Sequence, residues 1–428
     1  MKPINIKKNI KKFSTAIITV GGISSALAFS PSAYVTSSRL SEGHWVKIST
    51  DTAGVCEIPY DKLRQWGYSD PTAVNVYGHG PLSLFDDALD TPRPDDITPT
   101  FSINDTVRER IFFYSPGVVE VKMTSAGTNG ITIDRSPFAK RASFLLSDRP
   151  VFESDTIPRP ISAPGDVSQP IDAHYSVGLV EYEFQNPADG GAVFLGPDIT
   201  HNNEVFFTFD FKNMGSGSTK WSTAYMNVAF AGIDAGGQTR ATLDLRDNLK
   251  TSEAKITTTA IPLVYDETIA YRHGSIQMSW TRPLDGQRTF GITPYLKTTP
   301  RFLAFDNAWT AYPRLSRMDD ADACLDMFFP GVFSSNSFSL DAPSSVRVLN
   351  ITNPEAIFEH SLISDATCSR LLGRFDRSYT SSQDNSDPVC RLIAFNPDVA
   401  QLQVQYEGEV PNSNLHGVAT PEMLIRRT

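Results

Sequence analysis

Residues 205–211 read VFFTFDF, with Val205, Phe207, Phe209 and Phe211 on alternate positions. Successive side chains of a β-strand point to opposite faces of its sheet, so this pattern predicts a strand that buries one face and exposes the other. The same period of two recurs in two later stretches, at Met226, Val228 and Phe230 and at Ile276, Met278 and Trp280. Such strands build antiparallel sheets with one face on a core, and they predict an all-β fold.

Turn residues separate these strands at intervals typical of a β-sandwich, at Gly215-Ser216-Gly217, Gly232, Gly236-Gly237 and Asp285-Gly286. We therefore predict a β-sandwich or jelly-roll-like domain over residues 171–345. A smaller β unit, or an extension of that domain, is predicted over residues 346–410. Its strands are expected at residues 346–350, at residues 392–395 and in the alternating stretch of Leu402, Val404 and Tyr406.

Residues 29–170 are dominated by short β-type runs, which predict an N-terminal β domain in tandem with the sandwich. Two of these runs, residues 45–48 and 54–58, are expected to form strands joined by a hairpin-like turn at residues 51–54. A two-turn helix is predicted over residues 59–67, with a proline at its first position and a glycine where a left-handed cap belongs.

Residues 1–28 have the three parts of a secretory signal peptide. Five lysines precede an apolar core, and Ala26-Leu27-Ala28 forms a small-residue cleavage site, so we expect the mature chain to begin near Phe29. The apolar core is shorter than the roughly 20 residues that span a bilayer, and no later stretch could cross one as a helix. Cleavage removes five lysines and no acidic residue, which changes the net charge from −10 to −15 and argues against nucleic acid as a partner.

Residue types that carry chemistry are sparse. The even number of cysteines leaves two states open, buried thiols and one disulfide, for Cys56, Cys324, Cys368 and Cys390. No histidine stands with them in a nucleophile signature, and the seven histidines lack the spacing of a metal site. We therefore predict no catalytic residue, no cofactor and no metal ligand in this chain.

An acidic stretch offers one alternative, because carboxylate oxygens are ligands for calcium. It contains Asp86, Asp87, Asp90, Asp95 and Asp96. Two prolines stiffen this segment, and it lacks the alternating Asp-x-Asp-x-Asp-Gly ladder of a calcium loop. A solvated acidic loop is predicted instead.

Residues 408–425 read GEVPNSNLHGVATPEMLI. A Pro/Asn/Ser turn cluster followed by an apolar run is typical of a linker that leads into a buried strand. We expect residues 411–428 to comprise a linker and the first strand of a further domain, in which Met423, Leu424 and Ile425 need neighbours on both sides. Without those neighbours the segment is expected to be disordered, or to lie loosely along an edge of the preceding β domain.

Five segments resemble, in order and spacing, the N-terminal region of the type IX secretion sortase (PorU) family. They are GHWVKISTDTAGVCEIPYDKLRQWGY at 43–68, VNVYGHG at 74–80, PRPDDITP at 92–99, ERIFFYSPG at 109–117 and the NLHG and PEMLI elements of the junction within 414–425. Looser matches at 174–199, 301–318 and 346–357 extend the resemblance over most of residues 43–425.

The resemblance implies a non-catalytic front part of a sortase, with a short stub of an α/β, caspase-like domain at residues 411–428. In the family, a gingipain-type cysteine peptidase domain follows this junction and processes the C-terminal sorting domains of secreted cargo. Its catalytic His and Cys lie beyond the junction, so His416 is expected to be a junction residue and not a general base. No enzymatic activity is expected from this chain alone.

The family also implies a place and partners. The expected partners are the peptidase domain or outer-membrane proteins of the type IX apparatus of Bacteroidota, and the expected location is the periplasm, the outer membrane or the cell surface. Whether the chain is a split gene, a frameshift product or a functional short form is left open by the sequence.

Two other functions also stay open. The chain is alternatively half of a split cysteine peptidase that acts with a separately encoded catalytic chain, or a cell-surface binding module for glycan or protein. A binding module would use exposed aromatic residues, for which the candidates are Trp221, Trp280, Trp309 and Tyr295. Trp280 lies on a core-facing alternation, which favours a structural role for that residue.

Overall fold

The computed structural model describes residues 35–81, 96–127, 130–136, 139–151, 170–186, 194–201, 203–215, 221–233, 239–247, 250–260, 264–266, 271–296, 302–331, 337–365, 370–375 and 389–417. Several sequence predictions lie outside these residues. They are the signal peptide, the acidic positions before Asp96, Cys368 and the terminal strand around residues 423–425.

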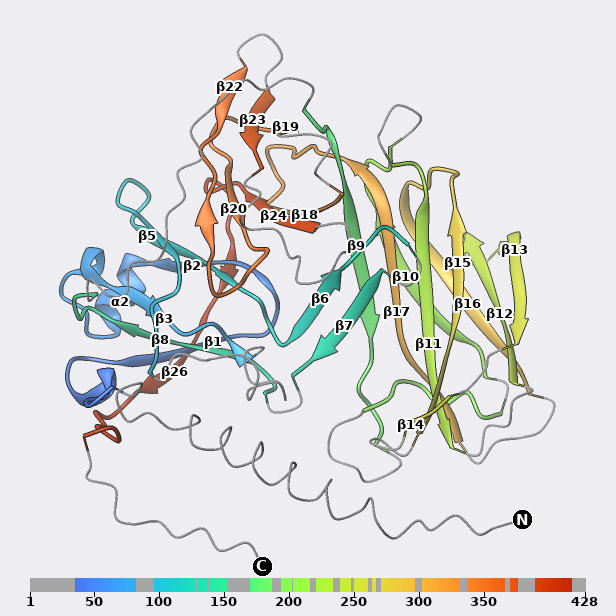
Figure 1. The fold of residues 1–428 in the computed structure, drawn as a ribbon, viewed down its shortest axis with the longest axis horizontal. Coiled ribbons are helices and arrows are strands. Elements are labelled where there is room, and N and C mark those ends of the chain that lie inside the picture. The colour runs from blue at the N-terminus through green and yellow to red at the C-terminus, as the bar shows by residue number, and fades with distance from the viewer. Residues whose placement is uncertain are drawn as a thin grey trace, which may run out of the picture.

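Nearly all regular elements are β-strands, which confirms the predicted all-β fold. Figure 1 shows an N-terminal module on the left, a large sandwich on the right and a small three-stranded sheet at the top. The described helices are all short, namely η3 (Arg39–Ser41), α2 (Tyr60–Gln65) and η4 (Pro71–Ala73). Among the described residues, no helix has the length and apolar character needed to cross a membrane.

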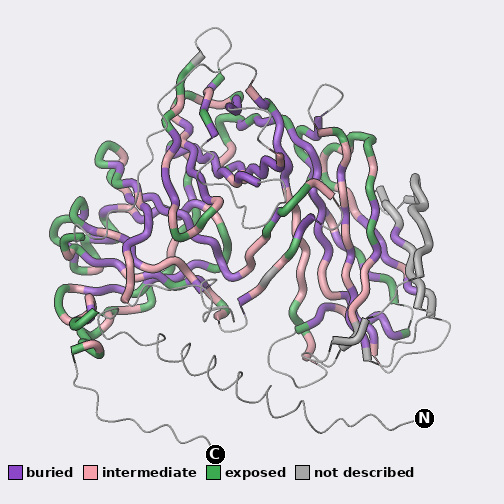
Figure 2. Tube along the Cα trace, in the orientation of Figure 1, coloured by how far each residue is buried: buried purple, intermediate pink, exposed green. Residues whose placement is uncertain are grey.

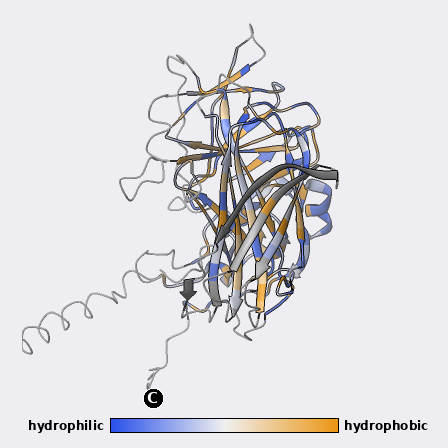
Figure 3. Cartoon of the chain, turned by 90° about the vertical axis from the view of Figure 1, so that its right-hand side faces the viewer, coloured by the Kyte–Doolittle hydropathy of each residue, from blue (hydrophilic) through white to orange (hydrophobic). Residues whose placement is uncertain are grey.

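Two sheets form the sandwich. The larger has the strand order β14 (Val264–Asp266), β15 (Tyr271–Trp280), β11 (Ala224–Ile233), β17 (Phe302–Leu315), β9 (Ala173–Glu181), β18 (Cys324–Pro330), β24 (Val389–Phe395), β20 (Arg347–Asn350) and β21 (Phe358–Glu359). The smaller has the order β10 (Val205–Phe211), β16 (Gly286–Leu296), β12 (Thr239–Asp247) and β13 (Lys250–Ala260). Figure 3 shows apolar and polar residues mixed along these long strands.

The sandwich core confirms the alternation seen in the sequence. Val205, Phe207, Phe209 and Phe211 of β10 are buried, with more exposed residues between them. They pack against the larger sheet, where the next two alternating stretches supply β11 and β15. The Phe211 ring lies 4.9 Å from the ring of Tyr312 between centroids. Burying an aromatic or aliphatic side chain contributes about 1.5–3 kcal/mol, so this face stabilises the sandwich.

The larger sheet continues past the expected boundary at residue 345. Its strands β24 and β20 come from residues 346–410, and β24 pairs with β18 on one side and with β20 on the other. A second core lies between this end of the sheet and a three-stranded sheet of order β19 (Ser337–Asp341), β23 (Arg370–Arg374) and β22 (Ile363–Asp365). The domain boundaries stay predictions, but the hydrogen-bonded ladder itself is continuous across residue 345.

The N-terminal module consists of two four-stranded sheets. The first has the order β26 (Gln405–Glu409), β1 (Val46–Thr50), β8 (Ala142–Ser147) and β3 (Asn75–Tyr77). The second has the order β25 (Leu402–Gln403), β2 (Gly54–Pro59), β5 (Arg110–Ser115) and β4 (Ser102–Asp105). A core of buried residues from both sheets, including Ile48 and Ile58, lies between them. Figure 2 shows that burial follows the strands, while the connections on the left remain exposed.

The predicted hairpin between the first two strands is wrong. Strand β1 pairs with β8 and β26, whereas β2 pairs with β5 and β25. The turn at residues 51–54 therefore carries the chain from one sheet to the other. The physical reason is packing, because Ile48 and Cys56 then both face the core between the sheets.

The helix predicted after β2 is present but shorter than expected. It spans Tyr60–Gln65, and Pro59 lies at the N-cap, one position before the helix. Tyr60 and Leu63 are its buried residues. Gly67 has a φ of +100°, which confirms the left-handed position expected at the end of the helix.

The last described strands return to the N-terminal module. Strand β25 pairs in parallel with β2, and β26 pairs antiparallel with β1. The alternating stretch of Leu402, Val404 and Tyr406 is thereby divided between two sheet edges, and Leu402 and Tyr406 are 37% and 47% exposed. The Tyr406 ring stacks on Trp66 at 5.4 Å between centroids. The chain thus closes on itself, with residues about 360 positions apart in one ladder.

A hairpin of β6 (Val119–Met123) and β7 (Ile131–Arg135) extends from the N-terminal module and packs on the sandwich. In Figure 1 it lies between the N-terminal module and the sandwich. Met123 and Ile131 pack on the face of the larger sheet that points away from the smaller one, against Tyr175 and Trp309. Both faces of the central strands are therefore covered.

Candidate functional site

The segment that follows β26 is bound to the segment that precedes β1. We call residues 37–45 and 410–417 together the terminal clasp. Val410 N donates to Trp45 O at 2.8 Å, and Ser413 N donates to Leu40 O at 2.9 Å. The two segments lie side by side at the lower left of Figure 1.

Asn414 is the centre of the clasp. Its Oδ1 accepts hydrogen bonds from Ser38 N at 2.8 Å, from Ser37 Oγ at 3.4 Å and from Gly417 N at 3.1 Å. The backbone N–H of His416 adds a bond to Ser38 Oγ at 3.2 Å. The NLHG element of the junction therefore acts through a side-chain amide and a backbone amide, and the assignment of His416 as a junction residue stays a prediction.

The N-terminal half of the clasp is itself anchored. The buried Trp45 donates its indole N–H to Glu42 O at 2.9 Å and packs on Tyr77 at 5.0 Å between centroids. Arg149 pairs with Glu42 at 3.1 Å from just beyond β8. Asp96, one residue of the predicted acidic loop, accepts a hydrogen bond from Arg39 N at 2.6 Å. These contacts fix residues 39–45 against the module, so the clasp holds residues 410–417 to a rigid support.

The expectation of a loose segment after β26 is thus only partly met. Residues 411–417 are mostly exposed and contain no strand, but the hydrogen bonds of the clasp fix their path, while residues 418–428 lie outside the described part of the chain. A single sequence offers only one local sign of this, an Asn with a Gly three residues later in a turn-rich stretch. The partner residues lie 376 positions away from Asn414, and nothing local identifies them.

Cys56 and Cys324 are poor nucleophiles. Burial raises the pKa of the Cys56 thiol far above its usual value; Cys324 is an exposed residue, but desolvation of its thiol still raises its pKa to about 12. Cys324 Sγ donates to Gln401 Oε1 at 2.9 Å, and neither Cys56 nor Cys324 is in a disulfide. Cys390 is buried near Asn350 and Thr352. Since the thiolate is the reactive species, neither Cys56 nor Cys324 is activated for nucleophilic attack.

Arg391 joins the hairpin to the larger sheet. Its guanidinium makes two contacts with the carboxylate of Asp326, at 2.6 and 3.1 Å, and donates to Val121 O at 3.3 Å. It also lies 4.6 Å from the ring centre of Phe328. Burial would lower the pKa of Arg391, but the charge and hydrogen bonds of Asp326, together with Tyr114 and Glu120, outweigh it and the pKa is raised. Arg391 is therefore charged, and it links the β6–β7 hairpin to the larger sheet.

A second polar cluster lies where β7 meets β9 and β17. Arg135 pairs with Glu183 at 2.5 Å and with Glu181 at 3.4 Å. Burial and these two carboxylates raise the pKa of Asp306 to about 6, and burial also raises the pKa of Glu181. In the described part of the chain, no group of three or more His, Cys, Asp or Glu residues has the arrangement of a metal site.

The aromatic residues considered for a binding surface are mostly core residues. Trp309 is buried against the β6–β7 hairpin, and Trp221 packs partly buried beside it. Trp280 packs partly buried on the sandwich core, with its ring 6.1 Å from Phe211. The side chain of Tyr295 lies outside the described part. These tryptophans therefore offer no exposed aromatic platform.

No protein-family model matches the sequence, and no curated protein matches it. A solved structure, the dimeric latent PorU from Porphyromonas gingivalis, matches with a TM-score of 0.74 and 20% identity, covering 91% of this chain and 35% of that chain. The carbohydrate-binding module CBM35 from Cellvibrio japonicus Abf62 gives a TM-score of 0.22 at 12% identity, covering 33% of this chain and 97% of its own. The VP2 subviral particle of infectious bursal disease virus gives 0.21 at 8% identity, covering 87% and 82%.

The last two TM-scores are too low to indicate a shared fold, whereas the match to PorU extends over nearly the whole described chain. The chain spans about a third of the length of PorU, 35%. At 20% identity the match establishes the fold. The chain therefore has the fold of the matched region of PorU, as the resemblance in its sequence implied.

Proposed function

We propose that this chain is the non-catalytic N-terminal portion of a sortase-like protein of the type IX secretion system. In this role it scaffolds or positions a gingipain-type cysteine peptidase that processes the C-terminal sorting domains of secreted cargo. The observation that carries the proposal is the match of 91% of the chain to PorU, together with the ordered sequence elements of that family.

The clasp supports a positioning role. It fixes the segment after β26 on the β1 edge of the N-terminal module, through Asn414 and the backbone of Leu40 and Trp45. A peptidase domain attached or docked there would be held against a rigid module and not on a free tether. The raised pKa values of Cys56 and Cys324 agree with a chain that performs no thiol chemistry itself.

The proposed place of action is outside the cytoplasm, in the periplasm, the outer membrane or at the cell surface of a member of the Bacteroidota. The proposed partners are the peptidase domain or outer-membrane proteins of the secretion apparatus. The support for this is the signal-peptide pattern of residues 1–28 and the secretion-system identity of the PorU family.

Deletion of the gene in its source organism tests the proposal. We expect secreted cargo to retain its C-terminal sorting domain, as detected by mass spectrometry, and complementation with the wild-type chain to restore processing. Unchanged cargo processing in the deletion strain would contradict the proposed role.

A further inference from the structure

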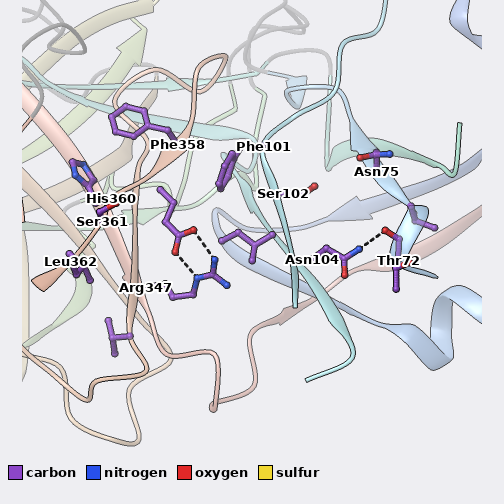
Figure 4. Close-up of a pocket in the computed structure, with 14 residues that line it drawn as sticks. Thr72, Asn75, Phe101, Ser102, Asn104, Arg347, Phe358, His360, Ser361 and Leu362 are labelled. Carbon is purple, nitrogen blue, oxygen red and sulfur yellow. Dashed lines mark hydrogen bonds and ion pairs between the residues drawn. The ribbon is translucent and has the colours of Figure 1, made fainter. Parts of the chain in front are cut away.

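A polar groove of about 830 Å³ lies where the N-terminal module meets the far end of the larger sheet. One wall comes from Thr72, Val74 and Asn75, before and in β3. The opposite wall comes from β20, β21 and the residues that follow, 358–362. Between them lie three consecutive residues of β4, Ser102, Ile103 and Asn104, and Figure 4 shows this arrangement.

Strand β4 is the last strand of its sheet, so one of its backbone edges has no neighbouring strand. The orientation of that edge follows from the hydrogen bonds just before it. Thr100 N donates to Val76 O at 2.9 Å, on the side away from β5. Because the backbone of a strand alternates, Ser102 and Asn104 direct their N–H and C=O groups to that same side. The backbone bonds to β3 end at Thr100, before these residues. Among the described residues, no backbone group bonds the outward N–H and C=O groups of Ser102 and Asn104.

The opposite wall carries a second edge. Strand β21 is the last of the larger sheet, and His360 N donates to Val348 O at 2.8 Å. The alternate residues Glu359 and Ser361 therefore point their backbone groups away from β20. Both also line the groove. A strand edge is a template for another extended chain, and here two edges border one groove.

The side chains of the groove are largely engaged already. Asn104 donates to Thr72 O at 2.7 Å and accepts from the hydroxyl of Tyr60. Arg347 and Glu359 form a two-point ion pair, at 2.6 and 2.7 Å, and among the described residues of the lining they are the only Lys, Arg, Asp or Glu residues. What the groove offers to a ligand is therefore chiefly backbone, in a neutral setting.

This favours a peptide over a sugar. Phe101 and Phe358 line the groove but are only 8% and 1% exposed, so neither offers a ring face for a sugar. Backbone groups on a strand edge recognise an extended peptide whatever its side chains are.

We propose that the groove binds an extended polypeptide segment of low net charge, which adds to β4 as a fifth strand of its sheet. The segment pairs with the outward backbone groups of Ser102 and Asn104. This site is distinct from the terminal clasp and does not rest on the proposed function.

Selection of a phage-displayed library of random linear peptides on the full chain tests this proposal. We expect enriched peptides to slow hydrogen exchange of the Ser102 and Asn104 amides by about tenfold or more. The Ser102→Pro variant removes one outward donor without removing a bond to β5, and it should lose binding.

The peptide itself supplies a readout that does not depend on variant folding. N-methylation of every second residue should abolish binding in one register and leave it in the other, because only alternate N–H groups of an added strand pair with β4. Three results would overturn the proposal. They are the absence of any enriched peptide, peptides insensitive to both N-methyl registers, and strong protection of the Ser102 and Asn104 amides in the free protein.

Discussion

Replacement of Asn414 by alanine should open the terminal clasp without unfolding the module. The change removes the acceptor for Ser38 N and Ser37 Oγ, which are the two bonds that this side chain makes across the clasp. A net hydrogen bond contributes about 0.5–1.5 kcal/mol, and the bond to Ser37 is long and exposed, so we expect a loss of about 1–2 kcal/mol in the free energy of local opening. That corresponds to roughly a 5- to 30-fold larger equilibrium constant for local opening.

The assay is hydrogen exchange of the Val410 and Ser413 amides, which donate to Trp45 O and Leu40 O. Exchange at these two amides should accelerate by that factor, while the core strands of the sandwich remain unchanged. The matched control is Asn412→Ala, because Asn412 is exposed in the same segment and makes no hydrogen bond in the described structure. Equal exchange in the two variants, or no acceleration in Asn414→Ala, would refute the reasoning.

Four further predictions concern the rest of the chain. Arg391→Ala should lower the free energy of unfolding in urea by about 2 kcal/mol, since Arg391 is mostly buried while its partner Asp326 is partly exposed to solvent, whereas Arg317→Ala at an exposed pair should change it by about 1 kcal/mol or less; equal effects would be inconsistent with a structural role for Arg391. The pKa of Asp306 in the folded protein is about 6, above its ordinary 3.8. The protonated carboxyl therefore contributes stability that is fully present below about pH 4 and is lost as the pH rises through 6. Asp306→Asn should therefore gain stability relative to wild type between pH 4 and 6 in thermal melts, and a difference that is flat with pH would count against it. Cys324 should react slowly with iodoacetamide at neutral pH, without peptide turnover by the chain; rapid labelling with turnover would contradict the absence of an activated thiol. Mass analysis of the exported protein should find Phe29 or a near neighbour at the N-terminus, and an intact Met1 would contradict signal cleavage.

The strands of the sandwich could be predicted because their signal is local. In β10, alternate residues must be apolar for one face to be buried, and this constraint is written directly into residues 205–211. The left-handed glycine at position 67 is equally local, because only glycine takes that φ without strain.

Pairing between distant strands could not be predicted in the same way. The turn at residues 51–54 has the composition of a hairpin, but the choice between a hairpin and a crossing to the opposite sheet is decided by the core around Ile48 and Cys56. Strand β26 could not be assigned to β1, because an exposed edge strand carries little apolar pattern.

The candidate site shows the same difference between local sequence signals and long-range pairing. The junction motif around Asn414 is visible in the sequence as a unit, but its hydrogen bonds to Ser37 and Ser38 depend on the β1–β26 ladder. The groove beside β4 carries no sequence motif at all, because it is built from backbone edges that any side chains can provide. Sites that depend on backbone exposure are set by topology, which a single sequence does not reveal.

Binding to the peptidase region of a PorU-like protein from the same organism is the most direct test of the proposed role. Calorimetric titration of that region into the full chain should give a saturable complex, and the Asn414→Ala variant should bind more weakly because its clasp no longer holds residues 410–417 in place. The absence of any complex, combined with peptide cleavage by the chain alone, would contradict a non-catalytic positioning role.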